Sequence, residues 1–188
     1  MVCGNIFPTE LWHGFTTDMS ENDIITRANE VFELRYPPRE RDRKLYPLNI
    51  LPSGRINYNL INDSRMKVLQ IILNSDNISD INFFIYNEKL FSIVIRWYNI
   101  QHNDLLQRAR QQYGNNRILQ YTLYSSEPPR GIPMWNLQGF DFFIWNTDFI
   151  YIDVLTNNRY FEEQKIREQI EKSDQERRRE EASSNIIF

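Results

Sequence analysis

The sequence predicts an α+β fold: an antiparallel sheet of two repeated hairpin–helix units, with its helices on one face as a two-layer sandwich. The first observation is a repeat. Ile81–Asn99 and Phe140–Asn158 align without a gap and are identical at six of 19 positions. The second is the alternation of apolar and polar residues on both sides of a short polar turn in each copy, which is the signal of a β-hairpin. Because a lone hairpin is marginally stable in water, we expect the two hairpins to complete one sheet.

The first element is a helix that precedes both repeats. Ser20 is suited to the N-cap position, and the acidic residues Glu21 and Asp23 follow it in the first turn, where the helix dipole favours them. Ile24 and Ala28 recur at helical spacing. The helix should end before the two prolines at positions 37 and 38, since proline disfavours helical geometry in the residue before it.

The middle of the chain is expected to contain an irregular loop and then the first unit. Residues 35–65 are rich in proline and charge and predict the loop, and Met66–Asn74 predicts a strand. In the first hairpin, the return strand should place Phe91, Ile93, Ile95 and Trp97 on one face. A helix follows, with Asn103 or Asp104 as its cap and Gly114 as its stop.

The second unit follows a short strand at residues 117–125 and a loop through "SSEPPRGIP". Its hairpin turns at residues 146–148, and its helix begins near Asn158. We therefore expect one domain over residues 1–170, with repeats near 81–114 and 140–170. Residues 171–188 form a charged extension: no apolar residue occurs between Glu171 and Glu181, which is typical of a helix projecting into water or of a disordered tail.

The alternation phase of the repeats assigns side chains to the two faces of the sheet. It predicts that four equivalent residues face the helices as core: Phe83, Ile85, Phe142 and Ile144. The opposite phase places four aromatic residues together on the other face: Phe84, Tyr86, Phe143 and Trp145. An exposed aromatic patch marks a partner site, so this face is the candidate binding surface. The alternative is that the sheet is buried on both faces.

Composition limits the chemistry. The net charge of −3 provides no basic field, so we expect no nucleic-acid partner. No run of 18 apolar residues is present, so no transmembrane segment is expected. One cysteine, Cys3, and two histidines, His13 and His102, are too few for a Cys/His zinc site. The sequence contains none of the common nucleotide-binding or hydrolase motifs, and we assign no catalytic residue, no metal site and no cofactor.

One pattern keeps an enzymatic alternative open. Asp153 is followed ten residues later by Glu163-x-Lys165, which resembles the Asp and Glu-x-Lys set with which metal-dependent nucleases hold Mg²⁺ and a water molecule. Glu163 and Lys165 fall in a predicted helix, however, where residues two apart point in different directions. The alternative function is therefore a metal-dependent hydrolase that uses Asp153, Glu163 and Lys165.

The order of motifs resembles that of small exported bacterial proteins. "HGFTTDMSENDI" is similar to their G-x-x-x-x-M-[ST] opening, "FFIYNEKLFSIVIRW" to their first hairpin, and "MWNLQGFDFFIWNTDFIYIDV" to their Trp-containing second hairpin. Such proteins are often periplasmic or lipoproteins, so the resemblance implies a periplasmic or envelope location, with a cytoplasmic one as the alternative. It transfers no catalytic residue. The first residues form no signal peptide as written, although they fit the end of one, and Cys3 fits a lipid-attachment cysteine poorly.

These observations together predict a non-enzymatic binding or structural module of a bacterial cell envelope. It would bind a protein partner or a second copy of itself through the aromatic face or the charged tail. Peripheral or lipid-anchored membrane association is left open.

Overall fold

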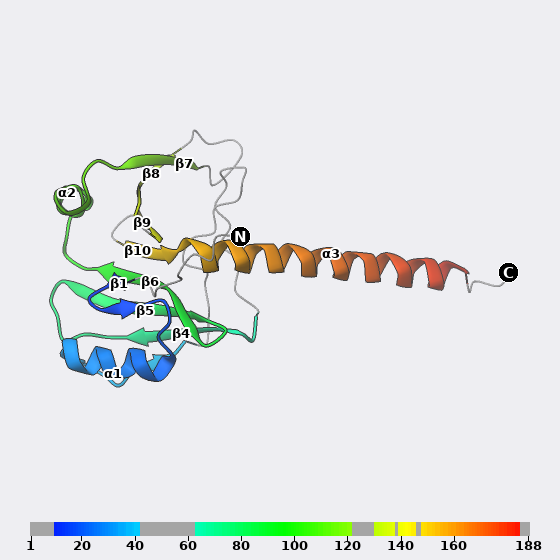
Figure 1. The fold of residues 1–188 in the computed structure, drawn as a ribbon, viewed down its shortest axis with the longest axis horizontal. Helices are drawn as coiled ribbons and strands as arrows, with labels where there is room; N and C mark the ends of the chain where they lie inside the picture. The colour runs from blue at the N-terminus through cyan, green and yellow to red at the C-terminus, as the bar shows by residue number, and fades with distance from the viewer. Residues whose placement is uncertain (1–9, 42–62, 122–129, 138, 146–147, 185–188) are drawn as a thin grey trace, which may run out of the picture. The chain divides into compact units, whose positions relative to one another are not determined.

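The computed structural model describes residues 10–41, 63–121, 130–137, 139–145 and 148–184. Its main feature is an antiparallel sheet of eight strands in the order β3-β4-β5-β6-β10-β9-β8-β7 (Figure 1). The strands are β3 (Arg39–Glu40), β4 (Met66–Ile71), β5 (Ile78–Tyr86), β6 (Lys89–Trp97), β7 (Arg117–Tyr121), β8 (Arg130–Asn136), β9 (Phe140–Trp145) and β10 (Asp148–Asp153). The described residues also form three helices, and this combination of helices with an antiparallel sheet confirms the α+β class.

The two similar sequence segments form hairpins that lie side by side. Strands β5 and β6 join through Asn87 and Glu88, whose φ angles of 48° and 64° are typical of the tight turns that suit twisted strands. Strands β6 and β10 pair next to each other, with Ile93 opposite Tyr151 and Ile95 opposite Phe149. The hairpins therefore meet at the centre of the sheet through their second strands.

Helix α1 (Glu21–Val31) begins as predicted. The Ser20 hydroxyl accepts a hydrogen bond from the Asp23 backbone N–H, and the Asp23 carboxylate accepts one from the Ser20 backbone N–H. This reciprocal capping box satisfies two donors that the helix cannot satisfy itself. The buried side chains of Ile24 and Ala28 then join the core on one face of the sheet.

The predicted core is confirmed at all four positions. Phe83, Ile85, Phe142 and Ile144 are each at most 1% exposed and belong to one apolar cluster, which also contains buried side chains of both flanking helices. Phe91 was wrongly assigned to this face. A bulge in the β5–β6 pairing lets Leu90 join the cluster instead, and the Phe91 ring contacts Phe84 and Tyr86 on the other face.

Helix α2 (His102–Tyr113) lies on the same face as α1. Its N-cap is Gln101, two residues before Asn103 and three before Asp104, the two predicted caps, and Gln101 makes no side-chain capping bond. Its buried residues Leu105 and Ala109 point into the core, and Gly114 ends it at a φ of 79°, a value that suits glycine.

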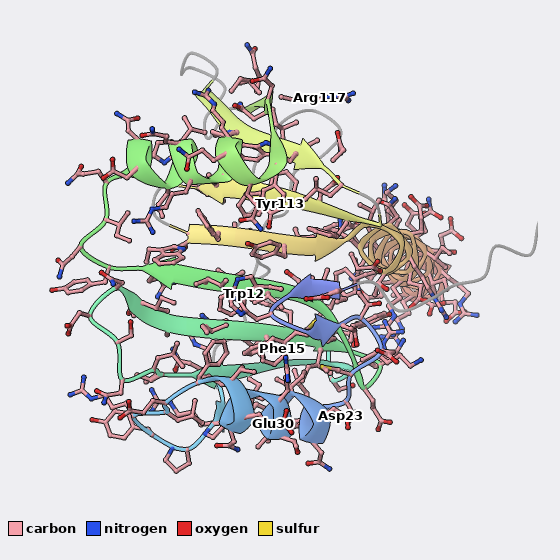
Figure 2. All side chains as sticks on the ribbon, turned by 60° about the vertical axis from the view of Figure 1, so that its left-hand side comes forward. Trp12, Phe15, Asp23, Glu30, Tyr113 and Arg117 are labelled. Atoms are coloured by element: carbon pink, nitrogen blue, oxygen red, sulfur yellow. The ribbon has the colours of Figure 1, made fainter. Side chains whose placement is uncertain are left out.

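A small hairpin that the sequence reading missed lies between the two helices. Strands β1 (Glu10–Trp12) and β2 (Phe15–Thr16) pair with each other, and Leu11 and Phe15 are buried in the core. Strand β1 contacts β6 and β10. Figure 2 shows this hairpin between α1 and α2, with Trp12 and Phe15 labelled. The turn at His13 and Gly14 has positive φ angles of 49° and 78°.

The reading of "SSEPPRGIP" as a loop was wrong at its C-terminal end. Strand β8 begins at Arg130 and pairs with β7, so that Pro133 lies opposite Ile118. Gly131 lies opposite Gln120, where a Cβ atom would come within 2.6 Å of the Ile118 side chain. Glycine therefore leaves room for the Ile118 side chain here, and strand pairing overrides a local composition that is typical of loops.

Helix α3 (Val154–Ser184) begins directly after β10, four residues before the predicted start. Contacts within the chain divide it into one compact unit over Met1–Asp153 and another over Val154–Phe188, so the predicted boundary at residue 170 falls inside this helix. Charged side chains form ion pairs within the helix: Arg177 lies 3.2 Å from Asp174 and 4.0 Å from Glu181. Within the described ranges, no helix combines the length and apolarity that crossing a bilayer requires.

Candidate functional site

A groove of about 500 Å³ opens on the helix-covered face of the first unit. Its floor comes from β5, β6 and β10, one wall from the β1–β2 turn and the end of α1, and the other wall from α2. The β4–β5 connection closes one end. The lining side chains are Trp12, His13, Val31, Phe32, Glu33, Leu73, Asn74, Ser75, Ile78, Trp97, Leu105, Arg108, Gln112, Phe149 and Tyr151. The size and the aromatic lining are typical of small-molecule sites.

The floor is aromatic and rigidly packed. The rings of Trp97 and Phe149 meet edge to face with centroids 5.4 Å apart, and Phe149 packs on Phe142 at 5.0 Å. Tyr151 shares a hydrogen bond with Tyr113 of α2, and burial is the main reason that the pKa of Tyr151 lies well above its usual value. Tyr151 is therefore a neutral hydroxyl at any physiological pH.

Trp97 carries a polar atom without a partner. Its indole Nε1 is enclosed by protein, and within the part of the chain that the structure describes it is the one buried side-chain nitrogen or oxygen that makes no hydrogen bond. By contrast, the Nε1 of Trp135 donates to the carbonyl oxygen of Gly114 at 2.9 Å. A buried donor left unpaired costs about 1–3 kcal/mol, and such groups are rare in folded proteins.

The first wall is held in place by hydrogen bonds around a tight turn. The Arg27 side chain donates from Nε and Nη2 to the carbonyl oxygen of His13, at 3.3 and 3.2 Å. Trp12 stacks on Phe32 with centroids 5.4 Å apart, and the His13 ring meets the edge of Trp12 at 4.5 Å. These contacts fix two aromatic rings above the floor.

The end of the groove contains a carboxylate that is already bonded. Asn74 donates from Nδ2 to Glu33 Oε1 at 2.7 Å, and its backbone N–H donates to the Glu33 carbonyl oxygen at 2.9 Å. The two residues thereby tie the end of α1 to the β4–β5 connection. The Glu33 carboxylate serves this link.

The second wall presents a cation. Leu105, Arg108 and Gln112 follow one another at spacings of three and four, so they lie along one side of α2. Arg108 and Gln112 are exposed, whereas Leu105 is buried. Arg108 has no hydrogen bond or ion pair with any residue in the described ranges.

The aromatic residues singled out from the sequence lie together on the opposite face. The strand register places Phe84, Tyr86, Phe143 and Trp145 on one side of the sheet, away from the helix-covered core. Their side chains form no exposed patch: Phe84, Tyr86 and Phe143 are only 5%, 3% and 6% exposed, and Trp145 is half-buried. This burial matches the alternative in which the sheet is covered on both faces. Partner binding there stays a prediction.

The same face carries a connected set of polar side chains. Arg41 donates to Asn82, Asn82 to Asp80, and Arg96 lies 3.3 Å from Asp80 and 3.6 Å from Asp148. Burial raises the pKa of Asp148, and the neighbouring Arg96 opposes that rise. Each member has a bonding partner, so this set serves to hold the strands together.

The residues of the enzymatic alternative lie on two different elements. Asp153 is buried at the end of β10, whereas Glu163 and Lys165 are part of α3. Glu163 pairs with Arg159 and Lys165 with Glu162, so both are engaged within the helix. In the described ranges, no three His, Cys, Asp or Glu side chains gather as a metal site.

The remaining candidates add no second site. His13 belongs to the groove, and His102 is the first residue of α2. Cys3 lies outside the described residues, as do 42–62 of the predicted loop; its described part contains strand β3. The groove itself was missed because six separate chain segments supply it. Comparison with family models, with curated proteins and with solved structures finds no match for this chain.

Proposed function

We propose that this chain is a non-enzymatic binding module and that the groove between the β1–β2 hairpin and α2 is its ligand site. The observation that carries the proposal is a groove of about 500 Å³ with aromatic side chains on its floor and on one wall. Grooves of this size, lined by rings with a few placed polar groups, are the usual sites for organic ligands.

Two of the ionisable groups of the groove, Glu33 and Tyr151, are hydrogen-bonded within the fold. The Glu33 carboxylate is engaged by Asn74, and the raised pKa of Tyr151 keeps its hydroxyl protonated. A general base needs a pKa near the working pH and a free approach to its proton. The rings offer stacking surface, and Gln112 and Ser75 offer neutral hydrogen-bonding groups to orient a ligand.

The test is a binding titration with a neutral apolar dye, N-phenyl-1-naphthylamine, whose fluorescence rises in apolar sites. Gln112→Trp places a bulky side chain in the groove, and Gln111→Trp makes the same change at the neighbouring exposed position outside it. We expect Gln112→Trp to weaken dye binding at least tenfold and Gln111→Trp to leave it unchanged. Equal binding by both variants would show that the groove is not the site.

We further propose that the sheet consists of two equivalent halves, α1-β3-β4-β5-β6 and α2-β7-β8-β9-β10, with helices as one layer and strands as the other. The gap-free repeat and the mirrored strand order about the β6–β10 pair support this. Phe83 and Phe142 hold equivalent places, and both are fully buried. Changing either to alanine should lower the free energy of unfolding by the same amount within about 1 kcal/mol. A much larger difference would argue against equivalent halves.

The location of the protein is proposed from the sequence resemblance. Likeness to small exported bacterial proteins supports a place in the bacterial envelope, where a binding module would meet ligands that enter from outside. Fractionation of the native host cells with an antibody against the chain tests this. Recovery in the cytoplasmic fraction would contradict it.

A further inference from the structure

We infer that the ligand of the groove is an organic anion with a flat aromatic body, and that its acidic group pairs with Arg108. This inference rests on the proposed function, because it names the class of ligand for the same groove. It follows from the charges along the two walls and from the shape of the floor.

Charge complementarity indicates the sign of the charge on the ligand. Arg108 is the one lysine or arginine among the described residues that line the groove, and it makes no ion pair within the described ranges. The carboxylate on the lining, that of Glu33, is bonded to Asn74 at 2.7 Å. The guanidinium on the lining therefore has no partner within the described ranges, whereas the Glu33 carboxylate accepts one hydrogen bond from Asn74 and keeps its negative charge. A guanidinium offers several donors in a fixed plane, which suits a carboxylate or sulfonate group.

Helix geometry carries the Arg108 side chain to the mouth of the groove. Leu105, one turn before it on the same side of α2, is fully buried against the floor, while Arg108 itself is exposed. The stem of the arginine can thus lie along the wall with its charged head at the rim. An acidic group bound there stays at the water boundary, so the ligand need not lose all hydration of its charge.

The aromatic body of the ligand is inferred from the aromatic side chains on one wall and on the floor of the groove. Trp12 and Phe32 form a stacked pair on one side, and Trp97 and Phe149 form the floor. Flat rings stack on or meet the edges of such side chains with a gain beyond burial alone.

The experiment compares two dyes of the same ring system. 1-Anilinonaphthalene-8-sulfonate carries a sulfonate, and N-phenyl-1-naphthylamine lacks it. Each dye is titrated by fluorescence into the wild type, Arg108→Gln and the matched control Arg110→Gln. Arg110 lies on the same helix, is exposed and is outside the groove lining. Circular dichroism checks that the variants are folded, because partly folded chains bind the sulfonate dye.

We expect Arg108→Gln to weaken binding of the sulfonate dye about fivefold, the effect of one partly exposed ion pair. Arg110→Gln should leave that affinity unchanged, and neither change should affect the neutral dye. Added salt should weaken binding of the sulfonate dye to the wild type more than binding to Arg108→Gln.

Two failures are distinguishable. If Gln112→Trp blocks the neutral dye but Arg108→Gln affects both dyes equally or neither, the groove binds ligands and the anion inference is wrong. If Gln112→Trp blocks neither dye, the proposed function fails as well.

Discussion

Replacing Phe142 by alanine tests whether the face of the sheet under the helices is the structural core. The Phe142 side chain is fully buried in β9 and meets four aromatic rings. Their centroids lie 4.7 to 5.2 Å away, on Tyr151, Phe149, Tyr113 and Trp135. Two of these neighbours come from β10, one from β8 and one from α2, so the ring links three strands to a helix.

The expected cost follows from these contacts. Burying a phenylalanine contributes about 1.5–3 kcal/mol, and the cavity left by its removal raises the loss to about 3–5 kcal/mol. The neighbours are large rings that hold one another in place, so the cavity collapses poorly. The loss should therefore lie in the upper half of that range, about 4–5 kcal/mol.

Urea denaturation followed by far-ultraviolet circular dichroism measures this loss. The slope of the unfolding free energy against urea concentration should stay close to that of the wild type, because the substitution changes little of the surface that unfolding exposes. Phe140→Ala in the same strand is the matched control: Phe140 is only half-buried and meets Tyr151 at 6.0 Å, so it should cost about half as much or less. A loss under about 1 kcal/mol for Phe142→Ala would refute the reasoning.

Three further predictions concern the cap, the two tryptophans and the tail. Hydrogen bonds from Ser20, its hydroxyl first, lower the pKa of Asp23. Its contribution to stability is therefore complete above the ordinary aspartate pKa and is lost as pH falls through the lowered folded-state value. Urea melts between about pH 5 and about pH 2 give the free energy of unfolding at each pH, and this free energy should fall less with acid in Asp23→Asn than in the wild type. Equal falls in both proteins would contradict the prediction. Trp97→Phe should change the unfolding free energy by under about 1 kcal/mol because it removes an unpaired donor, whereas Trp135→Phe loses the bond to Gly114 and should cost about 2 kcal/mol; the reverse order in urea melts would contradict this. Deleting residues 174–188 should leave the melting temperature nearly unchanged, since residues 171–182 are exposed apart from the half-buried Asp174, and should weaken any self-association in analytical ultracentrifugation; an unfolded product would show that the tail packs on the domain.

The parts of the fold that the sequence predicted are those with local signals. The capping box at Ser20 and the alternation around Asn87 lie within a few residues of the structure that they specify. The missed β1–β2 hairpin also had a local signal, the His13-Gly14 turn between apolar residues, but its strands are only three and two residues long. Strand β8 depends on pairing with its sequence neighbours β7 and β9, and the face of Phe91 depends on a bulge within its own hairpin, which the alternation pattern does not show.

The groove could not be predicted in the same way. Trp12, Phe32, Trp97, Arg108 and Tyr151 come from five parts of the chain, and no spacing rule connects them. Each is unremarkable in its own segment: four aromatic residues in segments that contain other apolar residues, and one arginine in a polar helix. Only the packing of α1, α2 and the small hairpin on one face brings these side chains together.

The central β6–β10 pair has a consequence for how the chain folds. Strands β4, β5 and β6 are neighbours in sequence and can pair early, as can β7 to β10, but joining the two groups closes a long loop. Until that step, β6 and β10 are unpaired edges rich in isoleucine and aromatic residues, exposed to other chains at the same stage. In the finished sheet the outer edges are β7 and the two-residue β3, which carries the exposed charged pair Arg39 and Glu40. We therefore expect refolding yield to fall as protein concentration rises, although in the native sheet both of these strands are paired on each side.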